Sequence, residues 1–157
     1  MPADDVDRFG FEETTDHVGV VAGKFLPQWL GRRAIDVTVS TDRRGYEVGE
    51  PVEFTVEFRN RLPVSVSLRT PTRRLWDWAV DGQLAASDER RYLGETGGSI
   101  DFRGGERRRI TREWNGLFKR TGERTRWVEP SPGEYELSAF LAVEGNRPED
   151  ATTVRIG

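Results

Sequence analysis

The sequence contains no cysteine and a single histidine, His17, among its 157 residues. Without cysteine the chain has no disulfide, no thiolate metal ligand and no cysteine nucleophile. One histidine is too few for a histidine metal site, and a Ser-His-Asp triad would depend on a residue near the N-terminus. Phosphate-binding loops, dinucleotide motifs and nucleophile elbows are also missing. We therefore expect a protein that is not an enzyme, with no catalytic residues, no cofactor and no bound metal.

Long hydrophobic runs and a leader-like N-terminus are absent as well. Residues 1–8 include three aspartates, whereas a secretory signal begins with basic residues and continues with apolar ones. No later stretch approaches the roughly 18 apolar residues of a membrane span. We expect a soluble chain without a membrane span, and the lack of cysteine fits a cytoplasmic location.

Lysine is scarce, and arginine supplies nearly all of the positive charge. The 27 acidic residues slightly outnumber the 24 basic ones, and the formal net charge is −3. Acidic residues are concentrated in residues 1–17, which we interpret as a mobile acidic arm. Residues 18–33 are apolar, but Gly19, Gly23 and Pro27 disfavour a long helix. We expect this second stretch to be an irregular segment that covers an open end of the core.

Most of the remaining chain alternates apolar and polar residues, as β-strands do when one face is buried. In the clearest case Val52, Phe54, Val56 and Phe58 alternate with polar residues. Similar stretches, separated by turn signals, are found at 34–40, 64–69, 75–80, 83–87, 99–102, 106–114, 134–143 and 151–156. We predict that residues 34–157 form one all-β domain, an immunoglobulin-like antiparallel β-sandwich of about eight strands.

Two tryptophans lie close together in a predicted hairpin. Asp81-Gly82 is a dipeptide preferred in two-residue turns, because the turn needs positive φ angles. Alternation places Trp76 and Trp78 on the face opposite Asp77. We interpret the two rings as core residues and Asp77 as a structural hydrogen-bond acceptor. A stacking site for a sugar or a nucleic-acid base is the alternative.

Positive charge gathers between Arg103 and Arg126, where nine basic residues stand against three acidic ones. We predict a loop from Asn115 to Arg126, and two of its residues are large and apolar in polar surroundings, which is typical of a binding loop. The alternative is that Phe118 packs beneath the loop. A second predicted loop spans residues 88–98. The candidate binding residues in the two loops are Leu117, Phe118, Lys119, Arg120 and Tyr92.

The same arginine-rich stretch is compatible with an anion-binding or nucleic-acid-binding function. A nucleic-acid module is also expected to show aromatic residues spaced along a groove and a basic net charge, whereas this chain is net acidic. An acidic protein surface suits the stretch equally well. We therefore expect a protein partner, and keep the anion or nucleic-acid binder as an alternative.

Five motifs follow one another along the chain: a strand at 54–60 that ends in Asn60, a short strand at 64–68, the hairpin at 76–82, a polar strand at 106–114 that ends in Trp114, and Pro-Gly-Glu-Tyr at 132–135. Their order resembles the BsuPI family, the intracellular proteinase inhibitor domain. The return strand at 84–87 is plainer than is usual in that family. The resemblance implies an immunoglobulin-like sandwich that inhibits or regulates a subtilisin-like serine protease noncovalently, through loops at one end. A general interaction or assembly module without inhibitory activity is the alternative.

Overall fold

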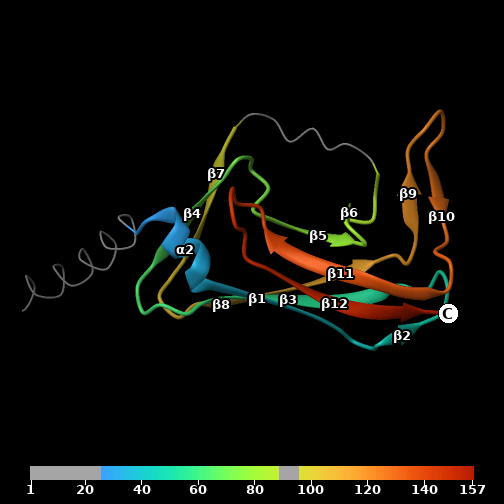
Figure 1. Ribbon diagram of the computed structural model, residues 1–157, viewed down its shortest axis with the longest axis horizontal. Coiled ribbons are helices and arrows are strands. Elements are labelled where there is room, and N and C mark those ends of the chain that lie inside the picture. The colour runs from blue at the N-terminus through green and yellow to red at the C-terminus, as the bar shows by residue number, and fades with distance from the viewer. Residues whose placement is uncertain (1–25, 89–95) are drawn as a thin grey trace, which may run out of the picture.

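The computed structural model describes residues 26–88 and 96–157 and shows a β-sandwich with one short helix in this part of the chain (Figure 1). The first sheet has the order β1 (Ile35–Thr41), β3 (Val52–Asn60), β8 (Arg107–Trp114). The second has the order β2 (Gly45–Tyr46), β12 (Glu149–Ile156), β11 (Gly133–Leu141), β5 (Trp76–Val80), β6 (Gln83–Leu84). Neighbouring strands are antiparallel, apart from the parallel pair β2 and β12. The fold is therefore the predicted all-β, immunoglobulin-like sandwich.

Two small sheets lie at opposite ends of this sandwich (Figure 1). At one end β4 (Val66–Thr70) pairs with β7 (Gly98–Phe102), beside the helix α2 (Gln28–Ala34). At the other end β9 (Phe118–Arg120) pairs with β10 (Arg126–Val128), and this hairpin projects from the sandwich. The two ends of the molecule therefore differ in what they present to solvent.

The core lies between the two main sheets and is built from the positions that alternation predicts. In β3 the four apolar residues are buried, whereas Glu53 and Arg59 are exposed. The two hairpin tryptophans pack across the sandwich onto this strand. The ring of Trp78 meets Phe54 edge-on at 5.1 Å between centroids, and that of Trp76 meets Phe58 at 5.9 Å. Both tryptophans are half-buried, so they pack against the core from its edge and are not central core residues as the alternation suggested.

The turn of this hairpin has the predicted conformation. Asp81 and Gly82 have φ angles of 47° and 78°, as a two-residue hairpin turn of this kind requires. Asp77 is buried on the opposite face from the tryptophans. Its Oδ1 accepts a hydrogen bond from the backbone N–H of Trp78 at 2.9 Å and lies 3.5 Å from Nη1 of Arg74. Asp77 is thus a structural acceptor.

Three details of the prediction are wrong. The described residues form twelve strands rather than about eight, because β2, β9 and β10 are two or three residues long and leave no alternation in the sequence. Residues 118–120, expected to lie in a loop, form β9. Residues 28–33, expected to be irregular, are helical, since the helix is fastened to a strand by tertiary contacts.

No helix within residues 26–88 and 96–157 is long and apolar enough to cross a bilayer.

The fastening of α2 explains why a sequence rich in helix breakers is helical here. The side chain of Gln28 donates to the Ser67 carbonyl at 3.1 Å and accepts from the Arg69 N–H at 2.9 Å. Gly31 faces β4, and a Cβ at this position would lie 2.8 Å from Cδ2 of Leu68. The helix therefore packs closely against β4 and covers one end of the core. The predicted acidic arm, residues 18–25 of the predicted covering segment and Tyr92 lie outside the described residues.

Candidate functional site

An aromatic cluster joins the base of the β9–β10 hairpin to the core. Trp114, the last residue of β8, is buried, and its indole N–H donates to the carbonyl of Leu117 at 2.8 Å. The rings of Trp114 and Phe118 are 5.5 Å apart, and Phe118 in turn lies 5.8 Å from the ring of Tyr135 in β11. The hairpin is therefore attached to both main sheets through these rings.

Phe118 belongs to this cluster and not to the surface. Its side chain is 5% exposed, so the expectation that it is offered to a partner is wrong, and the alternative that it packs beneath the loop is confirmed. The reason is that Phe118 is a strand residue whose side chain faces the core. Leu117, Lys119 and Arg120 are each half-buried. These three predicted binding residues are therefore partly exposed to solvent.

The side of β9 that faces away from β10 is occupied. The backbone N–H of Lys119 donates to the Ala86 carbonyl at 2.9 Å, and the Lys119 carbonyl accepts from the N–H of Asp88 at 3.2 Å. The carboxylate of Asp88 also accepts a hydrogen bond from the Thr121 N–H at 2.8 Å. The guanidinium of Arg120 lies 5.2 Å from the Phe118 ring centroid. Segment 86–88 thus holds the hairpin from one side.

The side chains of β10 and of the turn before it point into solvent. Every residue from 121 to 129 is exposed. Trp127 is 54% exposed, which is unusual for so large an aromatic residue, and Val128 beside it is also exposed. Neither Arg124 nor Arg126 forms an ion pair with a described residue. A hollow of about 670 Å³ beside the turn is lined by Asp88 and residues 120–126.

The arginine-rich stretch predicted from the sequence separates into two groups. Three arginines of β8 pair with carboxylates at the sheet surface: Arg107 and Arg109 lie 3.9 and 3.0 Å from the carboxylate of Glu57. Arg108 lies 2.7 Å from that of Glu106. Arg112 lies 5.6 Å from the Trp76 ring centroid, and Arg124 and Arg126 of the hairpin turn form no ion pair with a described residue. The binding potential of the stretch is therefore concentrated on the hairpin.

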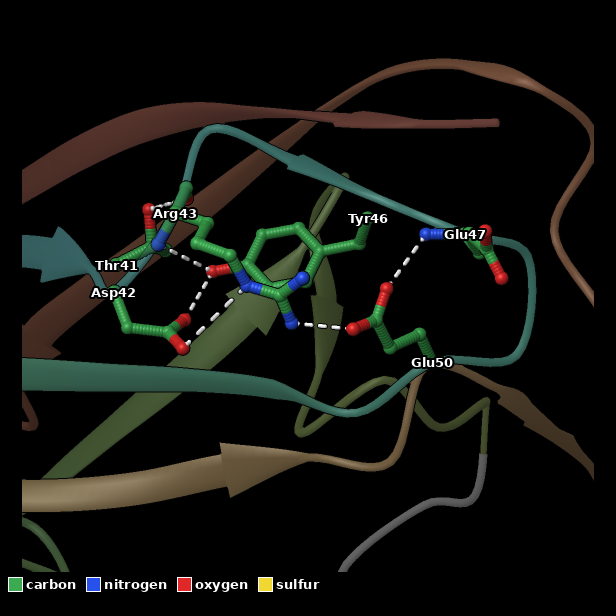
Figure 2. Close-up of polar contacts among 6 residues, drawn as sticks. All are labelled: Thr41, Asp42, Arg43, Tyr46, Glu47 and Glu50. Atoms are coloured by element: carbon green, nitrogen blue, oxygen red, sulfur yellow. Dashed lines mark hydrogen bonds and ion pairs between the residues drawn. The ribbon is translucent and has the colours of Figure 1, made fainter.

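A polar cluster at the connection from β1 to β3 is the second feature of this end, and sequence reasoning missed it. Figure 2 shows the buried Tyr46 hydroxyl between Asp42, whose carboxylate accepts its hydrogen bond, and the backbone N–H of Arg43, which donates to it at 3.0 Å. The guanidinium of Arg43 lies 4.7 Å from the Tyr46 ring centroid and pairs with Glu50. Glu50 also accepts from the N–H of Glu47 at 2.8 Å.

The electrostatics of this cluster, which we call the clasp (Asp42, Arg43, Tyr46, Glu47 and Glu50), indicate a structural role and not a catalytic one. Burial, together with the hydrogen bond to Asp42, raises the pKa of Tyr46. The backbone N–H of Glu47 and the guanidinium of Arg43 lower the pKa of Glu50. At neutral pH the tyrosine is therefore protonated and the glutamate is charged, which is the state in which both make their contacts. We interpret the cluster as a fastening of the β1–β2 turn.

The clasp and the hairpin lie at the same end of the sandwich (Figure 1). Gly116, with a φ of 75°, precedes β9, and a Cβ at this position would overlap the backbone carbonyl of Glu50. The turn into the hairpin therefore packs against the backbone that the clasp holds in place. An alternating strand pattern contains no signal for such a contact, because the two segments are distant in sequence.

Tyr46→Phe is expected to lower the free energy of unfolding by about 1–2 kcal/mol at neutral pH, because it removes the acceptor of the partly buried Arg43 N–H and the hydrogen bond to Asp42. The raised pKa of Tyr46 adds stability that is present below about pH 10 and lost as the pH rises through the folded-state pKa. Urea unfolding at about pH 8 and about pH 11 should show a larger alkaline loss for the wild type than for the variant. Tyr135→Phe, which removes a hydroxyl bonded to the Ser131 carbonyl at an exposed site, is the matched control. An equal fall in the free energy of unfolding between the two pH values in wild type and Tyr46→Phe would contradict the structural role of the Tyr46 hydroxyl.

Comparison with known proteins gives one match at the level of families. A family model described as "Family of unknown function (DUF7974)" matches residues 23–157. No curated protein matches the chain in sequence.

Several solved structures are similar to the chain. A CARDB domain from Pyrococcus furiosus is 14% identical with a TM-score of 0.49, and the match covers 78% of this chain and 94% of that one. A β-glucosidase from Listeria innocua in complex with isofagomine is 13% identical with a TM-score of 0.48, over 78% of this chain and 16% of the enzyme chain. The alkylpurine DNA glycosylase AlkC of Pseudomonas fluorescens, bound to DNA containing an abasic site analogue, is 12% identical with a TM-score of 0.46, over 82% of this chain and 33% of the glycosylase. At such identities these likenesses concern the fold alone.

Proposed function

This chain belongs to the DUF7974 family, and we propose that it is a protein-binding domain whose contact surface is the β9–β10 hairpin, residues 115–128. The observation that carries the proposal is an exposed Trp127 that follows Arg124 and Arg126, neither of which pairs with a described residue, on a hairpin whose base is fixed in the core. Tryptophan and arginine are the residues that most often dominate the binding energy of protein interfaces. A fixed base also lowers the entropy lost when a partner binds.

The charge of the hairpin favours an acidic partner. Residues 115–128 contain four basic residues and one acidic residue, although the whole chain has a net charge of −3. An acidic surface on another protein would be steered toward this positive projection and away from the rest of the domain. We therefore propose an acidic protein surface as the partner of the hairpin.

Reversing two hairpin charges, Arg124→Glu together with Arg126→Glu, is expected to weaken binding of a partner retained from lysate by at least about tenfold. The control is Arg69→Glu with Arg73→Glu, which changes the net charge equally at exposed positions near β4, at the other end of the sandwich. Affinities of the purified partner for the two double variants and the wild type would be compared by titration calorimetry. Equal affinities of the two variants would argue against the hairpin as the contact surface.

Noncovalent inhibition of a subtilisin-like serine protease is the more specific form of the proposal. It rests on the order of motifs that resembles the BsuPI family, and the family match names no inhibitor. The projecting hairpin would act by occluding the cleft of the protease. Titration of a cytosolic subtilisin-like protease with the purified domain tests this form. Full protease activity at micromolar excess of the domain would leave a general interaction or assembly module as the proposal.

Binding of an anion or a nucleic acid is the second candidate. It is favoured by the unpaired Arg124 and Arg126 and by the hollow beside them. Binding through these groups should weaken steeply with salt, since phosphate contacts release counterions. Titration with single-stranded DNA at two salt concentrations separates the candidates. Absent or salt-insensitive association would remove this second function.

A further inference from the structure

We infer that the hairpin binds its partner by strand addition, with an extended acidic segment of the partner protein pairing with the outer edge of β10. This inference rests on the proposed function and specifies how the hairpin makes contact. Within the described residues β10 has one neighbouring strand, β9, so its other edge is open. An open edge presents backbone N–H and C=O groups that an incoming strand satisfies.

The backbone contacts of β9 show which groups of β10 face outward. Both the N–H and the C=O of Lys119 bond to segment 86–88, and therefore point away from β10. In an antiparallel pair, residues directly opposite each other either bond to each other or both point outward. Lys119 lies opposite Trp127. The N–H and C=O of Trp127 consequently point to the open edge, on the residue that also carries the exposed indole.

The edge strands of the two main sheets are less suited to pairing. β8 is the outer strand of the first sheet, but its exposed residues include arginines paired with Glu57, and a charged edge discourages strand addition. β1 lies beside β12, and the N–H of Val39 bonds to the Asp150 carboxylate at 2.9 Å. β2 and β6 have two residues each. The edge of β10 combines open backbone groups with an apolar anchor.

The side chains of the hairpin define the chemistry of the incoming strand. Successive residues point to opposite faces, so Trp127 shares one face with Lys119, and Arg126 shares the other with Arg120. The partner residue that lies beside Trp127 should be apolar. The partner residue that lies beside Arg126 should carry a carboxylate, which can pair with the guanidinium of Arg126. Because β10 has three residues, backbone bonds alone give little affinity, and both kinds of side chain are needed. The fitting segment alternates acidic and β-branched residues.

The test uses the full chain and a blocked peptide of about ten alternating glutamate and valine residues as the probe. In the free protein the Trp127 amide should exchange with solvent faster than those of Arg126 and Val128, because it faces the open edge. Saturation with the peptide should slow exchange of the Trp127 amide at least about tenfold, and added salt should weaken the affinity. Lack of binding, or binding with no protection of this amide, would overturn strand addition.

Two variants separate the backbone contribution from that of the ring. Trp127→Ala removes the indole and keeps the N–H, and is expected to weaken peptide binding about tenfold. Trp127→Pro also removes the outward N–H, without deleting a bond to β9, and should weaken binding about tenfold more. Equal affinities of the two variants would overturn the inference. If the proline variant fails to fold, the exchange measurement on the wild type still tests strand addition.

The outcome for strand addition is separate from the outcome for the proposed function. In one outcome the double variant Arg124→Glu with Arg126→Glu loses the lysate partner while the Trp127 amide of the wild type stays unprotected in the partner complex. That result would overturn strand addition and keep a hairpin interface made by side chains alone. A partner that binds the charge-reversed variant normally removes the hairpin interface itself.

Discussion

Trp114→Ala is expected to lower the free energy of unfolding by about 3–5 kcal/mol, since it deletes a fully buried indole and leaves a cavity. The side chain is 1% exposed, packs against Phe118 and donates its N–H to the Leu117 carbonyl. Urea unfolding followed by far-UV circular dichroism measures the loss. Trp127→Ala is the matched control, because it removes the same side chain from an exposed position and should change stability by less than about 0.5 kcal/mol.

A second substitution at the same position separates packing from hydrogen bonding. Trp114→Phe keeps an aromatic ring in the cluster but lacks the indole N–H, and it should recover roughly half of the loss seen with alanine. Similar losses for Trp114→Ala and Trp127→Ala would contradict the assignment of Trp114 to the core and of Trp127 to the surface. Because Trp114 anchors the base of β9, the alanine variant should also bind a hairpin partner more weakly.

Asn60→Ala is expected to cost about 2–4 kcal/mol, which is large for a polar side chain. Asn60 is completely buried at the end of β3, where the chain leaves one sheet for the next. Its Nδ2 donates to the carbonyls of Val64 and Arg103 at 2.8 and 2.9 Å, and its Oδ1 accepts from the Leu62 N–H at 3.0 Å. Alanine would leave these three backbone groups without their partner, and each such loss costs about 1 kcal/mol or more.

Two further variants test this role of Asn60. Asn60→Asp keeps the acceptor but places a carboxylate against two carbonyl oxygens, so it should destabilise at least as much as alanine. Asn115→Ala is the control, because the Asn115 side chain accepts one hydrogen bond from the Leu117 N–H at an exposed position. That change should cost about 0.5 kcal/mol or less. A small loss for Asn60→Ala in urea unfolding would show that the turn is held by other contacts.

The sequence by itself determined the parts of this protein that depend on near neighbours. Alternation along residues 52–60 specifies which side chains of β3 face the core, because successive residues of a strand point to opposite faces. Asp81-Gly82 specifies a tight turn, since both positions need positive φ. Repeated along the chain, such local signals predict the strands and turns of the sandwich.

The candidate site was decided by the tertiary structure. Strands as short as β9 and β10 leave no periodic signal, and they form because segment 86–88 and the aromatic cluster hold them. Phe118 and Trp127 are both large aromatic residues in polar surroundings, yet one is buried and the other is exposed. The difference comes from contacts of Phe118 with Trp114 and Tyr135, which a local pattern does not contain. Contacts between distant segments thus determine which residues of this end can reach a partner.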